Sequence, residues 1–119
     1  MTSKTWLRVY AMAFGTLYPA YLKKMEAKGR TRAELDEAIR WLTGYTQDGL
    51  ERAMTDGTSV EAFFAEAPAM NPARTLVTGM ICGERVETIE EQPKRDIRTL
   101  DKMIDELAKG KAIAKVLRS

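Results

Sequence analysis

Apolar residues recur at helical spacing through most of the chain. The first segment has a stripe with steps of 3, 4, 3, 4 and 4 residues, formed by Leu7, Tyr10, Phe14, Leu17, Tyr21 and Met25. Such a stripe is typical of an amphipathic helix that packs one face on a core. Pro19 lies inside the stripe and lacks an N–H, so we expect a kink, or a junction of two nearly collinear helices, near Tyr18. Gly29 is then expected to end the element.

Two capping patterns predict the starts of the next helices. Thr31 is followed three residues later by Glu34, the order of a capping box, and Gly44 supplies a left-handed stop after an apolar stripe. Thr58 and Glu61 repeat the capping order before a short segment that contains two phenylalanines. We therefore predict helices after Thr31 and Thr58, with a weaker short helix between them because that stretch contains a glycine.

The segment after Asn71 has a less regular pattern. Asn71 and Pro72 are typical of a helix start, and the apolar pairs that follow lie four residues apart, so we predict a helix from Pro72. We expect this helix to end at Gly83 or to continue to Ile89. A short strand near 85–89 is the alternative.

The only cysteine, Cys82, lies in this segment between Gly79 and Gly83. We interpret the two glycines as close-packing positions or a helix C-cap, with a ligand or partner groove as the alternative. Unpaired cysteines usually behave as small buried hydrophobes, so we expect Cys82 in the interior. A thiolate activated by Arg85 is the alternative, although a helix end disfavours an anion.

The last element is the most regular. After Pro93, apolar residues step by 3, 4 and 3, and they are Ile97, Leu100, Ile104 and Leu107. Gly110 is expected to end this helix before a final short helical turn. Residues 1–119 are therefore predicted to form one all-α domain, an irregular bundle of about five to six helices, with the short strand near 85–89 as an option.

Charge is unevenly distributed, although the net charge is only +2. Residues 1–30 have six basic side chains and one acidic one, whereas residues 31–66 have three basic and eight acidic ones. The basic segment is a candidate for nucleic-acid phosphate contacts, and its members are Arg8, Lys23, Lys24, Lys28, Arg30 and Arg32. The alternative is a solvated face, and the nearby tyrosines fall on the buried stripe, where they could not stack on bases.

Several side chains that most catalytic and metal sites need are missing. The sequence has no histidine, and a single cysteine excludes an intramolecular disulfide and a Cys/His zinc site. Clustered carboxylates such as Asp101 and Asp105 have lysines nearby in sequence and are interpreted as solvated surface pairs. We expect no catalytic residue, metal or cofactor. The lone cysteine, and an apolar run shorter than the roughly 20 residues of a membrane span, favour a cytoplasmic protein without membrane contact.

A family resemblance is carried by blocks spread over nearly the whole chain: VYAMAF, YP, KGRT, WLTGY, FFAEAP, NP, TGMICGERVE and IRTLDKMIDELAKGK. Together they resemble the domain of unknown function 2200, a family of small prokaryotic proteins. The resemblance implies no established activity, although some members carry a label that relates them to the RecG DNA helicase. This chain has no GxxxxGK phosphate loop, so we expect neither helicase nor ATPase activity. It departs from the family after Pro93, where Lys94 and Arg95 replace apolar residues.

The function that these observations favour is a non-catalytic protein-interaction or accessory module. It would bind an unidentified protein partner or a second copy of itself through aromatic anchors or the glycine segment, and the candidates are Trp6, Trp41, Tyr45, Gly79 and Gly83. A position in the core is the alternative for Trp41. The second hypothesis is an accessory protein that binds nucleic acid through the basic N-terminal segment, which would be consistent with a RecG-related label.

Overall fold

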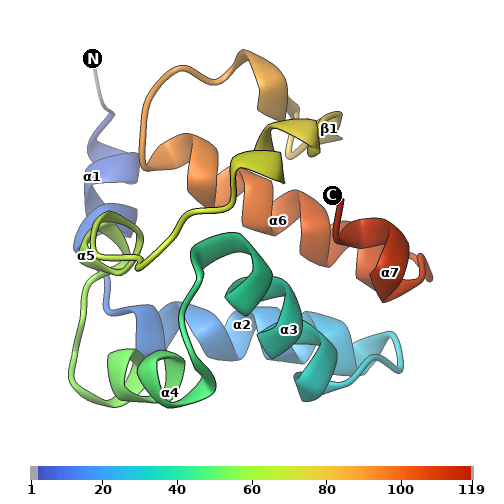
Figure 1. The fold of residues 1–119 in the computed structure, drawn as a ribbon. Helices are drawn as coiled ribbons and strands as arrows, with labels where there is room; N and C mark the ends of the chain where they lie inside the picture. The colour runs from blue at the N-terminus through green and yellow to red at the C-terminus, as the bar shows by residue number, and fades with distance from the viewer. Residues whose placement is uncertain (1–2, 119) are drawn as a thin grey trace.

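The computed structural model describes residues 3–118. In this part of the chain the elements are α1 (Lys4–Ala11), α2 (Phe14–Ala27), α3 (Arg32–Thr43), α4 (Gln47–Thr55), α5 (Val60–Ala65), the 3₁₀ helix η1 (Pro72–Leu76), β1 (Met80–Ile81), β2 (Glu84–Arg85), the 3₁₀ helix η2 (Val86–Thr88), α6 (Lys94–Ala108) and α7 (Ile113–Val116). The prediction of an irregular all-α bundle is confirmed, with one small hairpin added (Figure 1).

The N-terminal apolar stripe is divided between α1 and α2. The chain leaves helical geometry at Met12 and Ala13, and α2 continues past Tyr18, so the predicted junction of two helices near Tyr18 was wrong. The reason is tertiary: the Val60 N–H donates to the Met12 carbonyl at 2.7 Å, and the Phe14 N–H donates to the Thr58 carbonyl at 2.8 Å. Pro19 lies inside α2.

The predicted caps of the middle helices are confirmed except for one shift. The Thr31 hydroxyl accepts the Glu34 N–H, the Glu34 carboxylate accepts the Thr31 N–H, and Gly44 ends α3 at φ 77°. Before α5, however, Ser59 caps the helix by accepting the Ala62 N–H. The predicted cap was one residue too early.

The helix predicted from Pro72 was wrong beyond its first turn. Pro72 begins the short 3₁₀ helix η1, after which the chain extends and forms the β1–β2 hairpin, with Met80 opposite Arg85. Cys82 at φ 49° and Gly83 at φ 81° form the two-residue turn, the conformation that a type I′ hairpin turn requires. Of the strand considered near 85–89, only Arg85 lies in a strand, β2, and the residues after it form η2.

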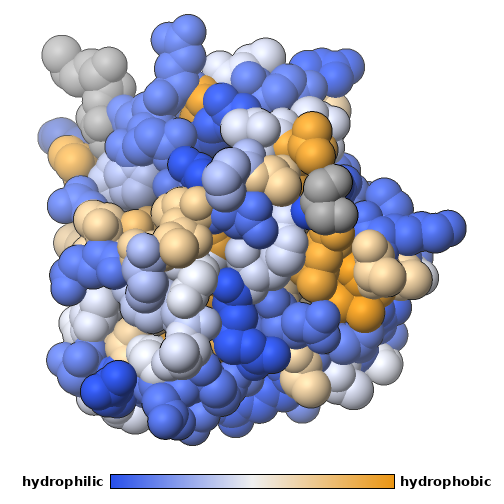
Figure 2. All heavy atoms as spheres, viewed as in Figure 1, coloured by the Kyte–Doolittle hydropathy of each residue, from blue (hydrophilic) through white to orange (hydrophobic). Residues whose placement is uncertain are grey.

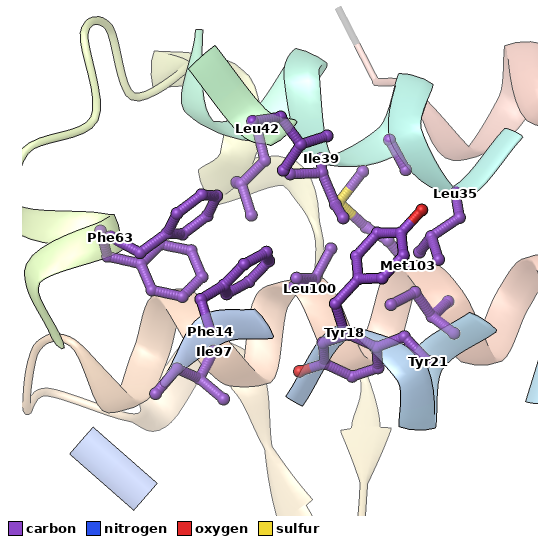
Figure 3. Packing of buried hydrophobic residues seen from close by; sticks show 14 of the residues in the cluster. Phe14, Tyr18, Tyr21, Leu35, Ile39, Leu42, Phe63, Ile97, Leu100 and Met103 are labelled. Carbon is purple, nitrogen blue, oxygen red and sulfur yellow. The ribbon is translucent and has the colours of Figure 1, made fainter. Parts of the chain in front are cut away.

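Helices α2, α3 and α6 pack against one another around the centre of the core, with α1 and α5 together at one end (Figure 1). Figure 3 shows the Phe14 and Phe63 rings face to face, and their centroids are 3.8 Å apart. The four apolar residues predicted for the inner face of α6 are all buried. Within residues 3–118, none of the helices has the length and apolarity needed to cross a bilayer.

Candidate functional site

The six basic residues predicted as a nucleic-acid face do not form one patch. Figure 1 places α1, which carries Arg8, at the opposite end of the molecule from the C-terminal end of α2. Three of the six are paired with carboxylates at 2.7 to 3.9 Å, and the pairs are Lys24–Asp105, Arg30–Glu34 and Arg32–Asp36. The Tyr18 and Tyr21 rings are buried, which leaves them poorly placed to stack on bases.

The aromatic candidates lie in three different environments. Tyr45 stacks on Phe63 at 4.6 Å and donates its hydroxyl hydrogen bond to the Phe63 carbonyl at 2.7 Å. Trp41 is half-buried and packs against the core. Trp6 is also half-buried, but it lies beside the charged N-terminal half of α6. Trp6 is thus the aromatic candidate with two cations beside its ring.

Two cations from successive turns of α6 lie over the Trp6 ring. Lys94 Nζ is 5.3 Å and Arg98 Cζ is 4.9 Å from the ring centroid, which is within cation–π range. Glu84, on strand β2, pairs with both cations, at 3.0 Å to Lys94 and 3.8 Å to Arg98. The hairpin therefore supplies the counter-ion for the cations that cover Trp6.

Arg98 also connects this group to α2. Its guanidinium donates to Asp101 Oδ2 at 3.1 Å, and the Tyr21 hydroxyl donates to Asp101 Oδ1 at 2.6 Å. Burial raises the pKa of Asp101, and the Tyr21 hydrogen bond and Arg98 oppose that shift. Burial and the neighbouring Asp101 charge hold the pKa of Tyr21 well above its ordinary value. We call the set Trp6, Tyr21, Glu84, Lys94, Arg98 and Asp101 the Trp6 cluster.

Open pockets flank the Trp6 ring. We call the larger one, of about 400 Å³, the Trp6 pocket; its lining residues are Ser3, Trp6, Glu84, Thr88, Ile89, Glu90, Glu91 and Lys94. The smaller one, of about 250 Å³, is lined mainly by apolar side chains, with Arg98 and Asp101 in its wall. The Trp6 pocket therefore has three carboxylates and one ammonium group around an aromatic ring.

The glycines beside Cys82 shape the hairpin and do not pack helices. Gly79 has φ 111°, and a Cβ atom at that position would lie 3.2 Å from Lys102 Cε. Cys82 is exposed at the turn, so the prediction of an interior thiol was wrong. The apolar pattern misled because its four residues do not share one buried helix face: Val77 and Ile81 are buried, whereas Leu76 and Met80 are about half exposed.

The sequence analysis missed most of the Trp6 cluster. Tyr21 was assigned to the core stripe, and its hydroxyl was a usable signal because buried tyrosines usually find a hydrogen-bond partner. Asp101 was interpreted as a solvated carboxylate, whereas its partners are Tyr21 and Arg98. Nothing in the local pattern indicates that Glu84 reaches α6, because that contact depends on the hairpin.

Other carboxylates are tied into the fold in the same way. Asp36 is buried and accepts hydrogen bonds from Tyr18 and from Gln47, the latter at 2.9 Å. Asp96 is buried beside Arg74, at 3.3 Å, and burial raises the pKa of its carboxyl group. Among the described residues, no group of His, Cys, Asp and Glu side chains is arranged to hold a metal ion.

Comparison with known proteins places the chain in a family. The family model described as "Uncharacterized protein conserved in bacteria (DUF2200)" matches residues 8–118. The crystal structure of the uncharacterized protein SP1917 is similar at a TM-score of 0.88 and 37% sequence identity, over 92% of this chain and 90% of that chain. No curated protein matches. The chain therefore belongs to the bacterial family of uncharacterized proteins DUF2200.

Proposed function

We propose that this protein is a cytoplasmic, non-catalytic interaction module that binds a partner protein at the Trp6 pocket. The observation that carries the proposal is the meeting of three elements distant in sequence at one open pocket. Helix α1 supplies Trp6, strand β2 supplies Glu84 and helix α6 supplies Lys94. A half-buried tryptophan held in place by neighbouring side chains is the kind of anchor that dominates interface energy.

The chemistry of the pocket favours a basic side chain of the partner. Three glutamates line the pocket against one lysine. Glu90 is exposed, whereas Glu84 is already paired with Lys94 and Arg98. We therefore expect a lysine or arginine of the partner to pair with Glu90.

Binding has more support than catalysis because the buried acid of the cluster is already occupied. Asp101 accepts the Tyr21 hydroxyl on one oxygen and the Arg98 guanidinium on the other. A general base needs a lone pair directed at a substrate proton. The nucleic-acid alternative has less support, because ion pairs neutralise half of the predicted basic residues.

The test is capture of partners from the native cell by the tagged protein and by matched variants. Glu90→Lys reverses an exposed charge of the pocket, and Trp6→Ala removes the anchor; both are expected to lose the partner that the wild type retains. Trp41→Ala is the control, because it changes a half-buried tryptophan elsewhere. Capture that all three variants leave intact contradicts the proposal, and partners that disappear on nuclease treatment favour the nucleic-acid alternative.

A further inference from the structure

Helices α3 and α4 form an open pocket away from the Trp6 cluster. The pocket has a volume of about 410 Å³, and its lining residues are Arg32, Ala33, Asp36, Arg40 and Gln47. The first four share one face of α3, and the last is the first residue of α4. In Figure 1 both helices lie below α6, whereas the hairpin that contributes to the Trp6 pocket lies above it. We call this second site the α3–α4 pocket.

The acid in the lining of the α3–α4 pocket is buried and already hydrogen-bonded. Asp36 is 4% exposed, and it accepts the Tyr18 hydroxyl on one oxygen and the Gln47 amide N–H on the other, the latter at 2.9 Å. The Gln47 amide oxygen in turn accepts a hydrogen bond from Arg40. The buried acid therefore fixes the orientation of Gln47, and Gln47 fixes that of Arg40. Figure 2 shows mostly hydrophilic side chains over the lower part of the molecule, where α3 and α4 lie.

Arg40 is half-buried but has no carboxylate partner within residues 3–118. Four other half-buried arginines each have a carboxylate oxygen at 2.6 to 3.3 Å, and they are Arg30, Arg74, Arg98 and Arg118. Arg95 is the other exception, but it does not line this pocket. A guanidinium group has several N–H donors, and Gln47 accepts from one nitrogen of Arg40. Arg40 therefore keeps donors that a ligand could use.

Arg32 supplies a second guanidinium group to the α3–α4 pocket. Its Cζ atom lies 5.5 Å from the centroid of the Tyr18 ring, and its Nε is 3.9 Å from Asp36 Oδ2. That separation is an ion-pair contact but is too long for a hydrogen bond, so Asp36 leaves the donors of Arg32 available. The lining thus has two guanidinium groups against one carboxylate, and that carboxylate is occupied by donors from within the fold.

We propose that the α3–α4 pocket binds the phosphate group of a small molecule between Arg32 and Arg40. Arginine pairs with oxyanions through two parallel N–H···O bonds. A carboxylate has two oxygens on one edge, which suits one guanidinium group, whereas a phosphate group has oxygens on several sides and can accept from both. The volume of the pocket fits a small ligand, because such sites usually measure roughly 300–1,000 Å³. This inference is independent of the partner proposed for the Trp6 pocket.

NMR titration of the ¹⁵N-labelled full chain with inorganic phosphate tests the proposal. The wild type should show saturable shifts at Arg32, Arg40 and Gln47, with a dissociation constant of about 1 mM because the probe is only the phosphate group. Arg40→Gln should weaken binding at least about tenfold. Arg52→Gln is the matched control, because it removes the same charge from a residue of α4 that is exposed and lies outside the pocket lining. It should leave the dissociation constant unchanged, and the spectra of both variants report whether the fold is kept.

A second anion separates recognition of phosphate from general attraction of negative charge. Acetate at the same ionic strength should bind the wild type at least about tenfold more weakly than phosphate, because it has two oxygens and one charge. Three results would overturn the proposal: no saturable shift of the pocket residues up to about 50 mM phosphate, an equal loss of binding in Arg40→Gln and Arg52→Gln, or acetate that binds as tightly as phosphate.

Discussion

Replacing Tyr21 by phenylalanine isolates the hydrogen bond that joins α2 to α6. The substitution removes one hydroxyl and keeps the ring, at a site where Tyr21 is only 9% exposed. In the wild type the hydroxyl donates to Asp101 Oδ1 at 2.6 Å, and without it the carboxylate keeps Arg98 at 3.1 Å. Hydrogen bonds to charged groups contribute about 1.5–3 kcal/mol, so we expect the free energy of unfolding to fall by about 2 kcal/mol.

The assay is urea unfolding followed by tryptophan fluorescence. A loss of about 2 kcal/mol from a total of roughly 5–15 kcal/mol should clearly lower the urea concentration at the unfolding midpoint. The slope of the unfolding free energy against urea concentration should not change. Tyr45→Phe is the matched control, because that hydroxyl donates to the neutral Phe63 carbonyl at 2.7 Å. Its expected cost is about 1 kcal/mol. Equal costs for the two variants, or no cost at Tyr21, would refute the argument that the charge of Asp101 makes this bond stronger.

The pH dependence of the Tyr21→Phe effect follows from the pKa of Asp101. Burial raises that pKa above its ordinary value, so the native state binds the proton more tightly than the unfolded state. The stability gained by protonation is therefore present at low pH and is lost as the pH rises through the folded pKa. The hydroxyl lowers this pKa, so its removal raises it further. The difference in stability between wild type and variant should be full at pH 7 and shrink as the pH falls through the folded pKa of Asp101; a constant difference contradicts the assignment.

Three further predictions test the core, a turn and the hairpin. Phe63→Ala should cost about 3–5 kcal/mol in urea unfolding, because its ring stacks fully buried on Phe14 at 3.8 Å. Gly44→Ala should lower the melting temperature far more than Gly57→Ala. Both glycines have φ near 80°, so the backbone strain is similar. A Cβ atom at Gly44, however, would lie 2.8 Å from a backbone oxygen, whereas a Cβ atom at Gly57 would have no atom within 4 Å. In the native protein, the exposed Cys82 thiol should react with a thiol reagent as fast as it does in the unfolded protein. A slower reaction in the native protein would contradict the position of Cys82 at the turn.

Local signals in the sequence predicted the structure correctly where that structure depends on contacts between residues close together in the chain. The capping box of Thr31 and Glu34 and the left-handed Gly44 involve contacts within a few residues, and both are present. The stripe of α6 was predictable for the same reason. The cap at Ser59 shows the limit of such signals, since either hydroxyl of a Thr–Ser pair could have capped α5.

The hairpin could not be predicted by the same means. The apolar pairs between Leu76 and Ile81 fit a helical period, but two adjacent residues with positive φ reverse the chain at Cys82. That turn usually has Asn-Gly or Asp-Gly, and the Cys-Gly found here gave no such signal. Packing of β1 and η2 on α6 stabilises the segment instead. Because Glu84 reaches Lys94 only through this turn, the candidate site was unpredictable along with it.

The buried tyrosines of α1 and α2 explain how the basic N-terminal segment can pack against the more acidic remainder of the chain. Each buried tyrosine donates a hydrogen bond to a carboxylate on a later element: Tyr10 to Glu91, Tyr18 to Asp36 and Tyr21 to Asp101. An aliphatic stripe would bury the same apolar area but would remove one donor from each of these carboxylates, at a cost of about 1.5–3 kcal/mol for each hydrogen bond lost. These acids are therefore held inside or beside the core; Asp36 also pairs with Arg32, and a further acid of α6, Asp105, pairs with Lys24.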